Sequence, residues 1–285
     1  MIKLQNTIKI IFISALLLIV GAFIFQSDPS ILAATERTVE NLSIDPEFQP
    51  ESGTYYYNVD WNKVNVGSAR ISVEQEESQY KIKVHAETNK KIDIVYKIRY
   101  RGESKISDDP ISPIETRIHE KIKSTKKETT IEFQENGAIK STETKSKKGE
   151  PAKETEREIQ TENFTLDPFS ATFLVRRLDW EAGMEEIFDV YTGKDQYLLE
   201  LKCIRKTTIE IAGENREAWE IVPELTNLNN KLDKTDRQED KKMNNMWIYV
   251  SADETKEMLK IKVSLKIGYF RIVLEKFEPA SETAE

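Results

Sequence analysis

The chain has 285 residues, with 42 basic and 50 acidic side chains and a net charge of −8. An excess of acid argues against a nucleic-acid-binding protein, because such proteins present a basic face to the phosphates. The 10 glycines and 9 prolines exclude a collagen-like chain, and one cysteine, Cys203, cannot form an intramolecular disulfide.

The first 34 residues have a composition of their own. They hold 22 apolar residues and three charged ones, so the rest of the chain has 40 basic and 49 acidic residues and a net charge of −9. Lys3 and Lys9 precede an uncharged run over residues 10–25, and the small pair Ala33–Ala34 follows. A basic start, an apolar run and small residues at the end predict a secretory signal peptide over residues 1–34.

The alternative for this segment is an uncleaved anchor in the inner membrane, with the body facing the periplasm. The apolar run of residues 10–25 is slightly shorter than the ~20 residues of a full membrane span, which favours cleavage. Both alternatives predict export to the periplasm. Membrane contact is expected only through residues 10–25, if the signal is not cleaved. Residues 20–34 contain no cysteine, which excludes a bacterial lipoprotein.

Residues 35–53 contain two prolines, a glycine and little periodicity, and we expect a flexible tether there. Apolar and polar residues then alternate, most clearly over residues 80–86, 130–134 and 259–267. Such alternation is typical of antiparallel strands with one buried and one solvated face. Turn signals separate the strands, and they are Asn62-Lys63, Asn136-Gly137, Gly193-Lys194, Gly213-Glu214 and Asp253-Glu254. The sequence therefore predicts an all-β, mainly antiparallel single domain over residues 54–278, a curved sheet or incomplete β-barrel of roughly ten to twelve strands.

One short amphipathic helix is expected within this β domain, over residues 167–177. Asp167 and Pro168 suit an N-cap and a first helical position, and Arg176-Arg177 suits a helix C-terminus. Phe169, Phe173 and Leu174 share one face, so the helix is predicted to cover the sheet as a plug or lid.

Two charged stretches, residues 141–158 and 229–245, contain only three apolar residues between them and are predicted to be disordered loops. We expect residues 279–285 to be a frayed tail.

The sequence offers no catalytic, cofactor-binding or metal-binding constellation. His85 and His119 are both expected on polar strand faces, without further metal ligands nearby. The acidic pairs Asp108-Asp109 and Asp253-Glu254 lie at predicted turns, where carboxylates usually bond to the backbone. Ser170 lacks the glycines of a nucleophile elbow. Cys203 is interpreted as a small buried residue of a strand.

Two aromatic stretches each allow two interpretations. The segment 96–101 could bind an acidic ligand, although an amphipathic strand with a basic outer face is favoured. Tyr55, Tyr57 and Trp61 share a strand face that could stack on sugar, although core packing is favoured.

Several ordered motifs resemble a known family. They are Tyr57-x-Val59-x-Trp61, Val66-Gly67, Tyr80-x-Ile82-x-Val84, Asp167-Pro168-x-Ser170-Ala171 with Arg176-Arg177 and Gly183, Trp247-Ile248-Tyr249-Val250-Ser251-x-Asp253, and Gly268. Over about residues 54–278 the chain resembles the exported bacterial family called domain of unknown function 3108. It departs from that pattern in the two charged stretches and at Glu257-Met258, where a proline is expected. The resemblance implies a periplasmic, largely β protein with no assigned activity and no catalytic residue.

These observations favour an exported, non-catalytic protein that binds a lipid or other amphipathic ligand in the concave face of its sheet. The first alternative is a structural or assembly factor of the cell envelope that contacts other proteins. The second is a hydrolase with an unrecognised site. No cofactor and no nucleic-acid partner are expected. The expected fold is analogous to that of the half-barrel lipoprotein carriers of the periplasm, and this analogy concerns the fold alone.

Overall fold

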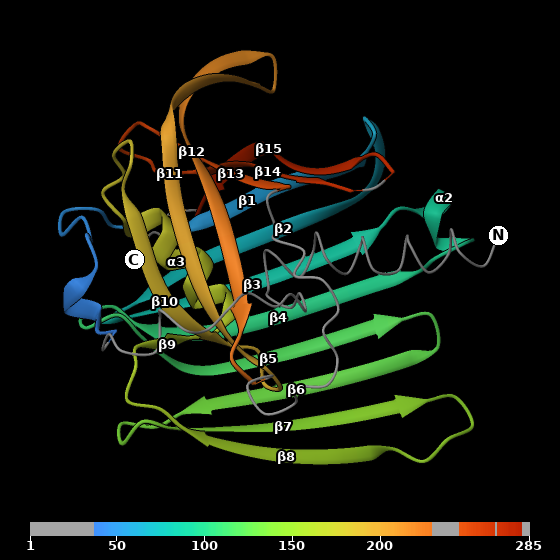
Figure 1. Cartoon of the computed structure of the whole chain (residues 1–285). Helices are drawn as coiled ribbons and strands as arrows, with labels where there is room; N and C mark the ends of the chain where they lie inside the picture. Colours follow the sequence, from blue (N-terminus) through green and yellow to red (C-terminus); the bar gives the residue numbers. More distant parts are fainter. Residues whose placement is uncertain (1–36, 230–244, 266, 281–285) are drawn as a thin grey trace, which may run out of the picture.

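A computed structural model describes residues 37–229, 245–265 and 267–280 of the chain (Figure 1). In chain order its elements are η2 (Val39–Asn41), β1 (Gly53–Trp61), β2 (Val64–Glu76), β3 (Gln79–Thr88), α2 (Lys90–Asp93), β4 (Ile98–Ser107), β5 (Ser112–Ile122), β6 (Thr125–Phe133), β7 (Ala138–Lys147), β8 (Lys153–Gln160), β9 (Thr165–Leu166), α3 (Pro168–Arg177), β10 (Glu185–Tyr191), β11 (Gln196–Ile211), β12 (Glu214–Asn227), β13 (Met246–Ser251), β14 (Met258–Ser264) and β15 (Tyr269–Pro279).

All of these strands form one sheet, in the order β8-β7-β6-β5-β4-β3-β2-β1-β15-β14-β13-β12-β11-β10-β9. Two series of hairpins, β1–β8 and β10–β15, meet where β1 pairs with β15. Neighbouring strands are antiparallel except β9 and β10, which are parallel. All five predicted turn signals lie between paired strands, and Asn62, Lys63 and the glycines at 137, 193 and 213 have positive φ there.

The sheet rolls up without closing. Its two edge strands, β8 and β9, follow each other in the chain, so the edges approach each other near residues 161–164. The turn between β10 and β11 then contacts β7 and β8: the Ser141 hydroxyl lies 2.9 Å from the Tyr191 hydroxyl and donates to the Gly193 carbonyl at 2.8 Å. Figure 1 shows β10–β12 crossing the layer of β3–β8 at a steep angle. The predicted incomplete barrel is confirmed, and side chains cross its seam.

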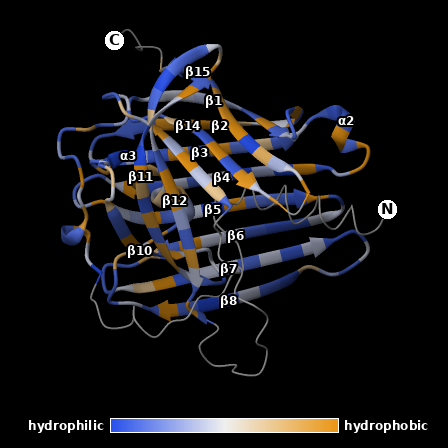
Figure 2. Cartoon of the chain, turned by 45° about the horizontal axis from the view of Figure 1, so that its top comes forward, coloured by the Kyte–Doolittle hydropathy of each residue, from blue (hydrophilic) through white to orange (hydrophobic). Residues whose placement is uncertain are grey.

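Burial alternates along the strands as the sequence predicts, with buried residues mostly apolar and the residues between them mostly polar. Figure 2 shows the matching alternation of hydrophobic and hydrophilic colour along the strands. The core residues come from nearly every strand and from α3, and they form one large cluster. A smaller cluster of Ile131, Ile139 and Tyr191 lies where the β10–β11 turn meets β6 and β7. The helix predicted over residues 167–177 is α3, and nine of its ten residues are buried.

The structure corrects the predicted strand number, because the described residues form fifteen strands rather than ten to twelve. Residues 141–158, predicted to be disordered, lie almost entirely in the β7–β8 hairpin. Composition is misleading here because charged pairs replace apolar contacts on the inner face: Lys127 pairs with Glu120 and Glu143 at 3.2 and 3.5 Å. Charge along β8 also protects an unpaired sheet edge.

Residues 37–53 also differ from the predicted flexible tether. Phe48 is buried, and Arg37 forms an ion pair with the buried Asp189 at 2.9 Å. Asp45 pairs with Lys256 at 2.6 Å. Apolar and charged contacts therefore hold this segment against the sheet, although it lacks strand periodicity. The predicted signal segment over residues 1–34 and most of the predicted loop over 229–245 lie outside the described residues. Pro279 ends β15, and residues 281–285 of the predicted tail are likewise not described.

Candidate binding surfaces

Helix α3 begins at a buried carboxylate. Asp167 is the N-cap, and its side chain accepts hydrogen bonds from the backbone N–H groups of Phe169 and Ser170 at 2.8 and 3.3 Å. The Ser170 hydroxyl also donates to this carboxylate, and the Ser104 hydroxyl donates to it from β4 at 3.0 Å. Complete burial raises the pKa of Asp167, and these hydrogen bonds oppose that rise. Ser170 therefore serves helix capping and packing, as the sequence suggests.

The other end of α3 carries two buried arginines. Arg176 donates to the Lys256 and Thr255 carbonyls at 2.8 and 3.0 Å and lies over the Phe48 ring. Arg177 forms an ion pair with Asp108, in the turn between β4 and β5. The acidic pair Asp108-Asp109 is thus at a turn, where one member fixes the helix C-terminus. Polar contacts hold α3 at both ends.

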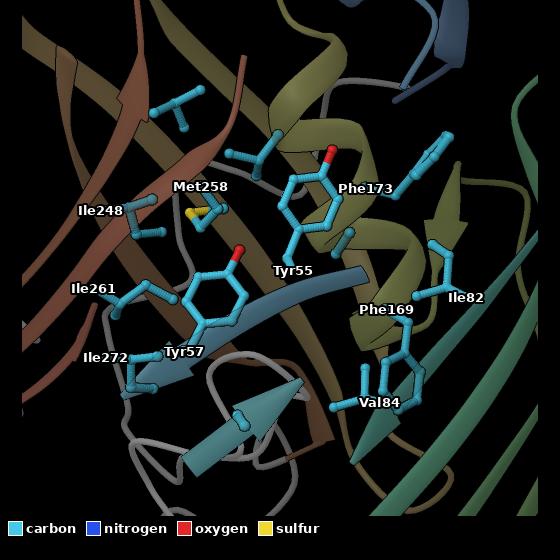
Figure 3. Close-up of a cluster of buried hydrophobic side chains, with 14 of the residues drawn as sticks. Tyr55, Tyr57, Ile82, Val84, Phe169, Phe173, Ile248, Met258, Ile261 and Ile272 are labelled. Atoms are coloured by element: carbon cyan, nitrogen blue, oxygen red, sulfur yellow. The ribbon is translucent and has the colours of Figure 1, made fainter. Parts of the chain in front are cut away.

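Aromatic and aliphatic side chains fill the space between α3 and the sheet (Figure 3). Tyr55 and Tyr57 from β1 point into this cluster with Phe169 and Phe173 from α3, which confirms core packing for the tyrosines. The cavity left here has a volume of about 30 Å³. That is room for a water molecule or two, so an acyl chain could enter only if α3 moved.

The motif around Ser251 builds a rigid turn between β13 and β14. Ser251 accepts a hydrogen bond from the Glu257 N–H at 2.7 Å and donates to Asp253 at 2.9 Å. Arg216 of β12 reaches both Asp253 and Glu257, at 2.8 and 2.6 Å. Glu257, where the resemblance leads one to expect proline, therefore has a partner of its own. The hydrogen bonds give these residues a structural role.

The outward face of β2–β5 carries a row of four basic side chains that sequence reasoning did not find. The strand register places Arg70 opposite His85, His85 opposite Arg101, and Arg101 opposite His119. We call these four residues the basic row; with ~4.8 Å between strands it spans about 15 Å. Both histidines of the chain belong to it. Only the pairing of β2, β3, β4 and β5 reveals the row, because its members are 15 to 18 residues apart in sequence.

The basic row lines a broad hollow of about 680 Å³, together with Tyr56, Lys83, Arg117 and one carboxylate, Glu103, which pairs with Lys81 at 3.4 Å. A neighbouring hollow of about 420 Å³ shares His85, Arg101 and His119 with the first. Its other charged lining residues are five cations and three carboxylates: Lys97, Arg99, Lys121, Lys126, Lys127, Glu87, Glu120 and Glu128. The two hollows therefore adjoin along the row, and cations outnumber carboxylates in both. The segment 96–101, with its predicted basic outer face, contributes Arg101 to the first hollow and Lys97, Arg99 and Arg101 to the second.

The charges beside the basic row are mostly paired, whereas two arginines in it are not. Lys83 pairs with Glu74 at 2.7 Å and Arg117 with Glu115 at 2.6 Å. Within the part of the chain that the structure describes, Arg70 and Arg101 form no ion pair. Partial burial and the charges of Arg70, Arg101 and Arg99 lower the pKa of His85 below its usual value of 6.5, against an opposing effect of Glu87. The His119 imidazole lies 3.6 Å from Glu128, so among the described residues Arg70 and Arg101 supply the unpaired positive charge of the row.

The remaining candidate residues lie apart from the basic row. Cys203 is buried in β11, and burial raises its thiol pKa to about 11, as suits a packed side chain. Among the described residues, no three His, Cys, Asp or Glu side chains are grouped as metal ligands would be. No helix in the described ranges has the length and apolar character needed to cross a membrane.

Comparison with known proteins adds the family. Residues 56–275 match the family described as "Protein of unknown function (DUF3108)". The chain belongs to this family. A search of curated proteins finds no match for this DUF3108 member. Among solved structures it is similar to the crystal structure of a β-barrel-like protein of the domain of unknown function DUF1849 from Brucella abortus. The TM-score is 0.53 at 8% sequence identity, over 82% of this chain and 100% of that chain. That likeness concerns the fold alone.

Proposed function

We propose that this DUF3108 protein is an exported, non-catalytic binding protein of the bacterial cell envelope. We further propose that it binds a ligand bearing phosphate or carboxylate groups on the basic row. One observation carries this proposal. Arg70 and Arg101 line a hollow of about 680 Å³, and neither forms an ion pair with any residue that the structure describes. Arginine binds planar and tetrahedral anions through several N–H groups at once.

Like charges directly opposite each other on a sheet destabilise it. His85 stands directly between Arg70 and Arg101 in the register, and the two arginines are two strand spacings apart, about 10 Å. An anion over His85 would reduce the repulsion between the two arginines and would favour protonation of the imidazole between them. A ligand with several anionic groups suits a row of this length better than a single small ion.

Titration calorimetry with myo-inositol hexasulfate tests the anion site, because sulfate groups keep their charge between pH 5.5 and 7.5. We expect the double variant Arg70→Gln, Arg101→Gln to bind at least about tenfold more weakly than the parent. Lys206→Gln is the matched control: Lys206 is a half-exposed cation of β11, paired with Glu217 at 2.7 Å and distant in strand order from the row. Equal binding by the parent and the double variant would refute the site.

Export is proposed on the composition of residues 1–34, with Lys3 and Lys9 before the apolar run of residues 10–25. Mass spectrometry of the protein from fractionated cells tests it. We expect a periplasmic protein that begins just after Ala33 or Ala34. An intact N-terminus in the inner-membrane fraction would instead support the anchored form. An intact chain in the cytoplasm would refute export.

A lipid or other amphipathic ligand in the concave face is the second candidate, and the open seam between β8 and β9 favours it. Because the cavity beside α3 is only about 30 Å³, binding of an acyl chain at this place requires α3 to move. Native mass spectrometry of protein purified from the envelope should then show a lipid adduct. Without an adduct, the anion site or an envelope-assembly role through protein contacts is favoured.

A further inference from the structure

Exposed apolar side chains gather at one end of the sheet. Five large hydrophobic residues are exposed among the described residues, and four of them lie at the end of the sheet that carries α2 (Figure 1). Val64 begins β2, Ile94 and Val95 follow α2, and Ile267 lies in the β14–β15 turn. Their exposed fractions are 64% for Val64, 87% for Ile94, 53% for Val95 and 60% for Ile267. The fifth, Ile204, lies in β11.

Hydrogen bonds join the three chain segments that carry these residues: the β1–β2 turn with the start of β2, the α2 segment, and the β14–β15 turn with the start of β15. Asn62, in the β1–β2 turn, donates its N–H to the Tyr269 carbonyl and accepts from the Tyr269 N–H, both at 3.0 Å. On the other side, the Asn89 side chain donates to the Asn65 carbonyl at 2.8 Å. We call the residues 62–65, 89–97, 265 and 267–268 the apolar tip. These hydrogen bonds hold the three segments of the apolar tip at the same end of the sheet.

The exposed residues of α2 are held in place by its local structure. Asn89 caps the helix by accepting hydrogen bonds from the N–H groups of Lys91 and Ile92, both at 3.1 Å. Ile92 packs against the core, and the Tyr96 N–H donates to the Ile92 carbonyl at 2.7 Å. Ile94 lies between these fixed points and faces solvent. Figure 2 shows hydrophobic colour on the α2 segment next to hydrophilic residues.

The charges around the apolar tip are positive. Its exposed cations are Lys63, Lys90, Lys91 and Lys97. Its single acidic residue is Asp93, which is paired with Arg99 and accepts a hydrogen bond from the Thr88 hydroxyl at 2.6 Å. Exposed apolar side chains with lysines around them are typical of proteins that bind a membrane surface.

We propose that the apolar tip docks on a phospholipid bilayer that contains anionic lipids. Val64, Ile94, Val95 and Ile267 enter the headgroup region, and the lysines contact lipid phosphates. This contact is separate from the one expected of residues 10–25. Lysine suits the role because its long apolar stem can lie along the acyl boundary while the ammonium group stays at the phosphates.

A site-specific probe tests this proposal in the full chain, because residues 10–25 could bring any variant to a membrane. Ile94→Cys is labelled with a polarity-sensitive nitrobenzoxadiazole dye and mixed with phosphatidylglycerol vesicles, with and without bromine on the acyl chains. Ile204→Cys, 42% exposed in β11, is the matched control. The labelled parent measures any reaction at the buried Cys203.

We expect the dye at residue 94 to shift to shorter wavelengths with anionic vesicles and to be quenched by brominated lipid. The dye at residue 204 should do neither. Lys90→Gln with Lys91→Gln should weaken the response at residue 94. An unquenched dye at residue 94 would overturn the proposal. A wavelength shift that depends on protein concentration without vesicles would also overturn it, in favour of a second copy of the chain as the partner.

Discussion

Arg176 lies over the ring of Tyr55 and donates a hydrogen bond to its hydroxyl at 3.0 Å, with 4.7 Å between the guanidinium carbon and the ring centroid. The two residues are 121 positions apart in the chain. Through this contact the C-terminal turn of α3 is tied to β1, the strand where the two series of hairpins meet.

Arg176→Met should therefore lower the free energy of unfolding by about 3 kcal/mol, because the carbonyls of Thr255 and Lys256 lose a buried donor. Tyr55→Phe removes one hydrogen bond and should cost about 1 kcal/mol. Urea denaturation followed by tryptophan fluorescence measures both. Arg117→Met, at an exposed arginine, is the control and should change stability by less than about 0.5 kcal/mol. If Arg176→Met lowered the free energy of unfolding no more than Arg117→Met does, the hydrogen bonds of Arg176 would not stabilise α3.

Gly102 makes room for the Phe169 ring, and this contact gives a second prediction. A Cβ at position 102 would lie 2.1 Å from the Phe169 Cζ, on the inner face of β4. Gly102→Ala should destabilise the fold by about 2 kcal/mol through overpacking. Phe169→Leu added to Gly102→Ala should recover part of that loss, because the shorter side chain withdraws from the new methyl group.

A double-mutant cycle of thermal or urea unfolding checks this coupling. The control is Gly149→Ala in the β7–β8 turn, where a Cβ would have no atom within 4 Å. That variant should lose only the advantage of glycine at positive φ, about 1 kcal/mol. Simple additivity of Gly102→Ala and Phe169→Leu would contradict the packing argument.

The alternation of apolar and polar residues was sufficient to predict antiparallel strands and an incomplete barrel, because burial of one strand face is a local property. The N-cap residue likewise was sufficient to predict α3. The β7–β8 hairpin was missed because its partners Glu120, Lys127 and Glu143 are charged and become complementary only when strands pair. The basic row could not be predicted for the same reason. Arg70 and His119 are 49 positions apart, and only the register of four strands aligns them.

The buried N-cap Asp167 predicts a pH dependence of stability. Burial raises its folded-state pKa above the usual 3.8, so the folded protein binds this proton more tightly than the unfolded chain. Its contribution to stability is therefore fully present below about pH 3.8 and is lost as pH rises through the folded pKa. Asp167→Asn keeps the capping oxygen but has no charge to bury.

Urea denaturation of the parent and Asp167→Asn between pH 4 and pH 7 checks this difference. The stability of the parent relative to Asp167→Asn should fall as pH rises. Asp167→Ala should be less stable than Asp167→Asn at every pH, by about 1 kcal/mol or more, because it lacks a cap. A constant difference between the parent and Asp167→Asn across this range would show that the carboxyl does not titrate with a raised pKa.

Anion binding on the basic row should take up a proton at His85. Partial burial and the charges of Arg70, Arg101 and Arg99 lower its pKa in the free protein below 6.5, and only Glu87 opposes them. A bound anion adds negative charge beside the imidazolium and raises that pKa. Binding of myo-inositol hexasulfate should therefore strengthen as pH falls from 7.5 to 5.5.

Calorimetry in two buffers with different ionisation enthalpies counts the proton directly. We expect uptake near pH 6 by the parent and a smaller uptake by His85→Gln. In His119→Gln, which removes the more exposed histidine, the uptake due to His85 should persist. Binding that is independent of pH in the parent would place the anion away from His85. It would then have to lie nearer to Lys83 and Arg117, which stand two residues from His85 and His119 along β3 and β5.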